Sequence, residues 1–256
     1  MIFYFSGTGN SYQAASILRG KEEPLFDMAD CLWRGETDFA LAEGEALGIV
    51  CPVYYGGLPS VVREFVRRLT LDRTPDYCYA VLTCGGKPYG AAAMLENDLR
   101  ARGIGLNAAF PVVMPDNYVL MFQIPEEKEQ DRILSEAEAR LRRIKVYAAY
   151  RRSMGLPIPA RDTLATRAMY PAYEYGRRTK KFYSDDQCVS CGICVSRCPA
   201  RAMVMENGRP KWVADRCIHC MACVRCGAVQ YGKSTVGKKR YTNPILKVKQ
   251  QKHHHH

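Results

Sequence analysis

The sequence has 256 residues, of which 47% are hydrophobic and 25% are charged, and its formal net charge is +11. This length and composition exclude a disordered chain and predict one or two globular domains. Because no apolar run approaches the ~18 residues of a membrane span and the start lacks the pattern of an export signal, we expect a cytoplasmic protein without a membrane span.

The first half of the chain alternates short apolar runs with segments of helical periodicity. The apolar runs predict strands at Met1–Phe5, Pro24–Met28, Ala46–Val53, Tyr77–Thr83 and Leu106–Met114. The periodic segments predict helices at Asn10–Arg19, Pro59–Leu69, Tyr89–Ala101 and Glu126–Tyr150. Strands that alternate with helices indicate a parallel sheet covered on both faces. We therefore assign residues 1–150 to one α/β domain.

The second half has a different composition and charge. Residues 1–150 hold 16 basic and 20 acidic side chains, whereas residues 151–256 hold 21 basic and 6 acidic side chains. Residues 151–183 form a predicted connector, in which Pro157, Pro159 and Pro171 are expected to break any long helix. Residues 184–236 are dense in cysteine and form a second small domain. A basic tail, residues 237–252, is expected to be extended or mobile, and residues 253–256 are a histidine tag.

A loop rich in glycine and hydroxyl groups, Ser6-Gly7-Thr8-Gly9-Asn10-Ser11, lies between the first predicted strand and the first predicted helix. A helix start presents free backbone N–H groups and the positive end of the helix dipole, which together bind phosphate. The loop lacks the lysine of a nucleotide triphosphatase, and its glycine spacing does not fit the dinucleotide fingerprint. It therefore predicts a site for a phosphomonoester, with an ordinary turn as the alternative.

Two further loops follow predicted strands at the same edge of the sheet. Residues 52–59 follow the strand at Ala46–Val53, and residues 83–90 follow the strand at Tyr77–Thr83. In open α/β sheets, ligands bind beyond the carboxyl ends of the strands. Three tyrosines in these loops offer flat faces for a planar ring, with packing inside the loops as the alternative: Tyr54, Tyr55 and Tyr89.

These three loops resemble those of the flavodoxin family over roughly residues 1–150. The resemblance implies a doubly wound parallel α/β sheet of strand order 2-1-3-4-5 that binds flavin mononucleotide (FMN). It implies that the phosphate is held by Ser6, Thr8, Gly9, Asn10 and Ser11. It also implies that the flavin ring is bordered by Pro52, Tyr54, Tyr55, Gly56, Thr83, Cys84, Gly85 and Gly86, with Asn117 and Tyr118 reaching the same site.

Eight of the twelve cysteines fall between Cys188 and Cys226. The spacing Cys188-x2-Cys191-x2-Cys194 recurs 29 residues later as Cys217-x2-Cys220-x2-Cys223, and Cys198-Pro199 completes the first run. This spacing is the bacterial run that holds [4Fe–4S] clusters. Zinc sites are the alternative, although four-cysteine zinc sites typically use separated pairs of cysteines.

The cysteine run resembles the bacterial ferredoxins that carry two [4Fe–4S] clusters, and so implies a small ferredoxin-like domain. The resemblance implies one cluster on Cys217, Cys220, Cys223 and Cys198, and a second on Cys188, Cys191, Cys194 and Cys226. Cys226 departs from the pattern, because the second run is one residue shorter before it and lacks the proline. A strained, labile or three-iron cluster is therefore the alternative at the second set.

Together, the two halves resemble the flavodoxin–ferredoxin fusion proteins that occur as single chains in anaerobes. This resemblance implies an electron-transfer protein that relays electrons between two iron–sulfur clusters and a bound FMN. The alternative is a flavin-dependent reductase of a small molecule, fed by its own clusters. The basic runs at residues 176–181 and 237–240 favour a redox protein partner with an acidic docking surface, and we expect no nucleic-acid partner, because no nucleic-acid-binding motif accompanies them.

Overall fold

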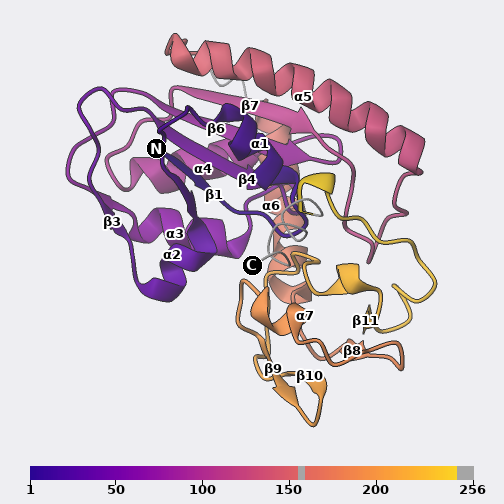
Figure 1. Cartoon of the computed structure of the whole chain (residues 1–256). Coiled ribbons are helices and arrows are strands. Elements are labelled where there is room, and N and C mark those ends of the chain that lie inside the picture. The colour runs from indigo at the N-terminus through magenta and orange to yellow at the C-terminus, as the bar shows by residue number, and fades with distance from the viewer. Residues whose placement is uncertain (155–158, 247–256) are drawn as a thin grey trace.

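The computed structural model describes residues 1–154 and 159–246 (Figure 1). Its helices are α1 Asn10–Leu18, α2 Met28–Arg34, α3 Ser60–Arg68, α4 Ala91–Arg100, α5 Glu127–Ala149, α6 Ala160–Gly176 and α7 Ile193–Ser196, followed by a 3-10 turn at Val224–Cys226. Its strands are β1 Ile2–Tyr4, β2 Leu25–Asp27, β3 Asp38–Phe39, β4 Leu47–Pro52, β5 Thr70–Leu71, β6 Cys78–Cys84, β7 Ala108–Val113, β8 Phe182–Ser184, β9 Met203–Glu206, β10 Arg209–Trp212 and β11 Val229–Tyr231. Within these ranges, no helix combines the length and apolar character needed to cross a bilayer.

Five parallel strands form the central sheet in the order β2-β1-β4-β6-β7. When these five strands are numbered along the chain, the order is 2-1-3-4-5, so the predicted fold is confirmed. The five predicted strands and four predicted helices all occur within a few residues of their expected bounds. The helix α2 and the short pair β3–β5 were not predicted, because both are too short to show a clear periodicity.

Side chains alternate between the two faces of the sheet, so each face has its own apolar core. Phe3, Ile49 and Ala80 pack against α2, α3 and α4, whereas their sequence neighbours Ile2, Val50 and Val81 pack against α1 and α5. Figure 1 shows α5 along one side of the sheet, with α2 and α3 on the other. The first turn of α1 and the loops after β4 and β6 therefore meet at one edge of the sheet.

The prediction that prolines break any long helix in the connector is wrong. Helix α6 begins after Pro159 and continues through Pro171. An internal proline costs about 3 kcal/mol, because its ring removes one helical hydrogen bond and crowds the preceding turn. Packing offsets this cost, since α6 buries Thr166, Tyr170 and Tyr173 against the α/β domain. Pro157 lies outside the described residues.

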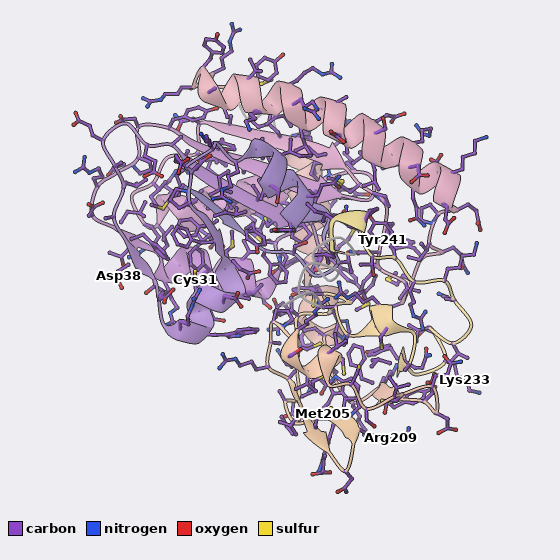
Figure 2. The ribbon with its side chains drawn as sticks, viewed as in Figure 1. Cys31, Asp38, Met205, Arg209, Lys233 and Tyr241 are labelled. Atoms are coloured by element: carbon purple, nitrogen blue, oxygen red, sulfur yellow. The ribbon has the colours of Figure 1, made fainter. Side chains whose placement is uncertain are left out.

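The predicted tail from residue 237 has no regular secondary structure over residues 238–243, but it packs against the α/β domain instead of extending away from it. The side chains of Tyr241 and Asn243 are 3% and 0% exposed. The backbone N–H of Asn243 donates to the carbonyl of Thr8 at 2.9 Å, so the chain returns from the cysteine-rich domain to the start of α1 (Figure 2). Residues 247–252 of the predicted tail, and the tag, lie outside the described residues.

Candidate functional site

The loop between β1 and α1 is open to an anion at the start of α1. Gly9 adopts a φ of 106°, which favours glycine, and within the described residues no side chain caps the helix and no acidic residue occupies its first turn. The uncapped N–H groups and the helix dipole favour a bound phosphate at this position. The loop therefore fits the phosphate group of FMN.

Most side chains of this loop are held by neighbouring loops of the sheet edge. Asn117 Nδ2 donates to Thr8 Oγ1, and Asn10 Nδ2 donates to the carbonyl of Pro115 at 3.0 Å. The hydroxyl groups of Ser11 and Thr83 lie 2.8 Å apart. Because the amide of Asn10 already donates within the protein, we expect the backbone N–H groups to be the main donors to a phosphate.

A cavity of about 400 Å³ extends from this loop across the edge of the sheet. It is lined by all of the predicted FMN-binding residues except Gly9: Ser6, Thr8, Asn10, Ser11, Pro52, Tyr54, Tyr55, Gly56, Thr83, Cys84, Gly85, Gly86 and Asn117. The volume lies within the usual range for cofactor sites. The structure thus brings these residues together, and their contacts with FMN stay a prediction.

Three further residues that line the cavity come from outside the α/β domain: Met169, Tyr173 and His219. Met169 and Tyr173 belong to α6, and His219 lies between Cys217 and Cys220 in the cysteine-rich domain. None of the three was predicted from the sequence to line the cavity. No local motif marks them, because they reach the cavity only through the packing of α6 and of the cysteine-rich domain.

His219 ends a chain of hydrogen bonds that begins in the cavity. The hydroxyl groups of Tyr55 and Tyr118 lie 3.1 Å apart, and the Tyr118 hydroxyl lies 3.3 Å from His219 Nδ1. His219 Nε2 lies 3.2 Å from the carbonyl of Arg178, so Nε2 carries the proton and Nδ1 accepts from Tyr118. Burial lowers the pKa of His219 below 6.5, which keeps the imidazole neutral at pH 7.

The two cysteine runs share an unusual backbone conformation. Ser190 and His219, which precede the second cysteine of each run, have φ values of 58° and 55°. Gly192 and Met221, which follow that cysteine, have φ values of 70° and 63°. Left-handed residues turn successive backbone N–H groups toward a common point, as anion-binding loops require. The internal repeat is therefore present in the conformation as well as in the sequence.

One set of four cysteines, called here the inner set, lines a single small cavity: Cys198, Cys217, Cys220 and Cys223. The backbone N–H of Ala202 donates to Cys198 Sγ at 3.3 Å, and that of His219 donates to Cys217 Sγ at 3.4 Å. Burial raises the pKa of Cys217 to about 11, so a bound metal is needed to hold its thiolate. Four cysteines around one cavity, two of which accept backbone N–H groups, fit a [4Fe–4S] cluster.

The other four cysteines, called here the outer set, lie nearer the surface: Cys188, Cys191, Cys194 and Cys226. Burial raises the pKa of Cys194, and the charges of the neighbouring Cys226, Cys188 and Cys191 raise it further. The shorter second run therefore still brings Cys226 into the neighbourhood of the outer set. In the part of the chain that the structure describes, no three His, Cys, Asp or Glu side chains lie close enough together to hold a single metal ion.

The inner set lies directly against the phosphate loop. A Cβ atom added to Gly7 would lie 2.1 Å from the carbonyl oxygen of Cys220 and 2.8 Å from its Cβ. Ile218, Cys220 and Ala222 also belong to the apolar core beneath the sheet. The two domains thus share a packed interface at the point where the cavity and the inner set meet.

Comparison with known proteins identifies the two parts. A family model described as a flavodoxin domain matches residues 1–103, and one described as a 4Fe-4S dicluster domain matches residues 187–229. The chain is a fusion of a flavodoxin domain and a 4Fe-4S dicluster domain. FMN and [4Fe–4S] clusters are therefore its cofactors, and electron transfer by flavin and iron–sulfur centres is its function.

A curated relative agrees with the assignment of the dicluster domain. A ferredoxin from Pyrobaculum islandicum is 29% identical over 77 residues, which cover 30% of this chain and 68% of the ferredoxin. Among solved structures, a putative flavoprotein from Bacteroides uniformis matches with 17% identity and a TM-score of 0.35, covering 44% of this chain and 88% of its own. An FMN-dependent NADH-azoreductase from Bacillus anthracis matches with 9% identity and a TM-score of 0.34, covering 58% of this chain and 98% of its own.

Helix α6 fastens two loops of the flavodoxin domain through one hydroxyl group. Thr166 Oγ1 accepts from the backbone N–H of Gly90 at 2.8 Å and donates to the carbonyl of Gly56 at 2.7 Å. Because both partners are buried, Thr166→Val leaves them unsatisfied, and we expect the protein to lose about 1–3 kcal/mol of stability. Thermal unfolding of the FMN-loaded protein measures this loss.

The matched control for Thr166→Val is Thr163→Val on the same helix. Thr163 is half-buried, and among the described residues its hydroxyl has no hydrogen-bond partner outside its own helix. We expect Thr163→Val to unfold within about 0.5 kcal/mol of the parent protein. Equal losses in both variants would show that the bond to Gly90 contributes nothing of its own.

The C-terminal segment fastens the phosphate loop from the other side. Tyr241 donates its hydroxyl proton to Asn10 Oδ1 at 2.6 Å, and Asn243 Nδ2 donates to Asn10 Oδ1 at 3.1 Å and to Gln13 Oε1 at 2.7 Å. We expect Asn243→Ala to weaken FMN binding about tenfold, which corresponds to about 1.4 kcal/mol, because the start of α1 loses its support. Fluorescence titration of the deflavinated protein with FMN measures this change.

Thr242→Ala is the control for the C-terminal segment. Thr242 is half-buried next to Asn243, and in the described part of the chain its hydroxyl makes no hydrogen bond. Its truncation is expected to leave the FMN dissociation constant unchanged. An Asn243→Ala protein that binds FMN as tightly as the Thr242→Ala protein would contradict a supporting role for this segment.

Proposed function

We propose that the chain relays electrons between an external donor or acceptor and FMN through two [4Fe–4S] clusters. The observation that carries the proposal is the contact between Cys220 and Gly7, which joins a cysteine of the inner set to the loop that fits the FMN phosphate. Burial raises the pKa of Tyr54, which lines the FMN cavity, and the charge of the nearby Cys220 thiolate raises it further. A cluster on the inner set would therefore be the neighbour of the flavin.

The order of the relay follows from exposure. In the outer set, Cys191 and Cys226 are exposed, whereas Cys198 and Cys220 of the inner set are 6% and 8% exposed. A cluster on the outer set is thus the one nearer to external partners. Cys194 of the outer set and Cys223 of the inner set connect the two sets, because both pack against the same buried cluster, Cys198, Ala202 and Met203. Electrons would pass from the outer cluster to the inner cluster and then to FMN.

The cofactors differ in the number of electrons that they exchange. Each [4Fe–4S] cluster accepts or donates one electron, whereas FMN accepts two electrons and takes two protons from water. Two single-electron deliveries through the clusters therefore complete one reduction of FMN. No side chain of the protein is consumed. The task of the protein is to hold the cofactors close together and to exclude water. Thiolates persist in the reducing cytoplasm, where we place this protein.

The composition of the protein purified without oxygen tests this proposal. Iron, sulfide, zinc and flavin are assayed on one sample, together with the absorption spectrum. About eight irons and one FMN per chain are expected for two complete clusters. About seven irons would indicate a three-iron cluster on the outer set, where Cys226 departs from the usual spacing. Zinc without iron would contradict the relay.

A second function, reduction of a small molecule at the flavin, is favoured by one observation. Tyr118 presents a hydroxyl group to the cavity, and that hydroxyl is hydrogen-bonded to the neutral His219. Such a group is placed to move a proton at a bound substrate. A Tyr118→Phe variant tests this function. The reductase is supported if the variant turns over a small electron acceptor more slowly while it still reduces FMN through the clusters at the parent rate.

A further inference from the structure

A broad groove opens on the dicluster domain, away from the FMN cavity. It lies between residues 175–181, β8 and the β9–β10 hairpin. Five cationic side chains line it, against two acidic ones, Glu206 and Asp215: Arg178, Lys180, Lys181, Arg209 and Lys211. We call this surface the basic groove. Figure 2 shows Arg209 and Met205 on the hairpin at the end of the dicluster domain that is farthest from the sheet.

Three of the five cations are not neutralised by the protein. Arg209 lies 3.3 Å from Asp186, and Lys211 lies 2.7 Å from Glu206. Within the described residues, the side chains of Arg178, Lys180 and Lys181 form no ion pair, although Lys181 Nζ lies 5.9 Å from the ring centre of Tyr231. A surface with unpaired like charges in a groove focuses its field outward and attracts an anionic partner.

The basic groove and the cavity of the inner set lie on opposite sides of the same two aromatic side chains. Phe182 and Trp212 line the groove and also line the cavity of the inner set. Their rings stack with centres 5.4 Å apart and planes 9° from parallel. At one end of the groove, Arg209 donates to the carbonyl of Asp185 at 3.0 Å, three residues before Cys188 of the outer set. A molecule in the groove would therefore be a close neighbour of both cysteine sets.

We propose that the basic groove is the docking site of a small acidic redox protein that exchanges electrons with the clusters. The proposal rests on the proposed relay, because a partner needs to approach the clusters only if they carry electrons. Charge complementarity selects the partner, since the unpaired cations attract an acidic surface. Nucleic acid also carries negative charge. However, a nucleic acid would gain nothing from a groove that lies beside both cysteine sets, whereas a redox protein would.

The electron transfer at this groove balances in single steps. A reduced [2Fe–2S] partner loses one electron, and one [4Fe–4S] cluster of this chain gains it. After two encounters, two electrons reach FMN, which takes two protons from water, and two partner molecules have been oxidised. Docking itself forms or breaks no bond, so the groove acts on the association rate rather than on the transfer step.

A charge-reversal variant tests the docking site. The groove variant carries Arg178→Glu, Lys180→Glu and Lys181→Glu. The matched control carries Lys21→Glu, Arg73→Glu and Lys128→Glu, three exposed cations of the flavodoxin domain that make no ion pair among the described residues. Both variants change the net charge equally. The probe is a reduced, acidic plant-type [2Fe–2S] ferredoxin, and anaerobic stopped-flow absorbance follows its oxidation.

The bimolecular rate is expected to fall about tenfold or more in the groove variant at low ionic strength, with a smaller fall in the control. High salt is expected to remove the difference, because it screens the charges. Equal rates in the two variants would overturn the docking site. A single-stranded RNA oligonucleotide is added as a competitor of the probe ferredoxin. If the RNA competes in the parent protein and in the control but not in the groove variant, the proposed protein partner is overturned in favour of nucleic acid.

A small reductant separates this proposal from the relay. Dithionite needs no docking site, and high salt screens its own negative charge, so at high ionic strength it is expected to reduce FMN equally fast in the parent protein and in the groove variant. If dithionite bleaches the clusters but not FMN, the relay is overturned. The groove is then still tested by calorimetry, which measures the binding of the probe ferredoxin. Normal reduction by dithionite, together with unaltered binding of ferredoxin to the groove variant, overturns the groove alone.

Discussion

Cys220→Ala is expected to abolish the rapid reduction of FMN through the clusters. Cys220 is the cysteine of the inner set that touches the phosphate loop, and its loss removes one of four thiolates from the cluster nearest to the flavin. Iron is expected to fall from about eight to about four per chain, because a cluster with three thiolates and no replacement ligand is labile. Iron analysis and anaerobic stopped-flow absorbance measure the two effects.

Cys191→Ala is the matched control for Cys220→Ala. Cys191 is an exposed member of the outer set, so its loss is expected to remove a similar amount of iron. The inner cluster and its contact with the flavodoxin domain remain, and dithionite is expected still to reduce FMN through it. Rapid flavin reduction in the Cys220→Ala protein, with its iron halved, would contradict the assignment of the inner set as the neighbour of FMN.

Gly7→Ala is expected to separate the two domains at the point where their cofactor sites meet. The added methyl group would lie 2.1 Å from the carbonyl oxygen of Cys220, so the inner-set loop must move by about 1 Å to restore a normal contact. Overpacking of this kind costs about 1–3 kcal/mol. We expect a lower melting temperature and slower electron transfer from the clusters to FMN, with the iron content unchanged.

The control for Gly7→Ala is Gly105→Ala. Among the described residues, no atom lies within 4 Å of a Cβ added to Gly105 beyond its chain neighbours, and its φ is not positive. The same chemical change there is expected to leave both the melting temperature and the electron-transfer rate unchanged. If Gly7→Ala also leaves the rate unchanged, the contact with Cys220 does not set the distance between the cofactors.

The parts of the site that lie on the sheet edge were predictable from the sequence. Apolar runs and helical periodicity locate the strands, and parallel strands bring the loops after them to one edge. Asn117, which follows the last strand, indeed reaches Thr8. The cysteine spacing was also informative, because two-residue gaps fix a conformation that the structure repeats at Ser190 and His219.

The parts that close the site were not predictable, because they depend on packing between distant segments. Pro171 indicated a break, but the burial of Tyr170 and Tyr173 keeps α6 continuous and brings Met169 to the cavity. Composition indicated a mobile tail, yet Asn243 is fully buried against α1. In both cases tertiary contacts override a local preference.

Stopped-flow reduction of the intact protein tests whether electrons pass from the clusters to FMN within one chain. The protein is mixed without oxygen with limiting dithionite, and the absorbance of the clusters and of the flavin is followed at several protein concentrations. The clusters are expected to be reduced first, and FMN is then expected to be reduced at a rate independent of protein concentration, as a transfer within one chain requires. A flavin rate that rises in proportion to protein concentration would show transfer between molecules and would contradict the relay.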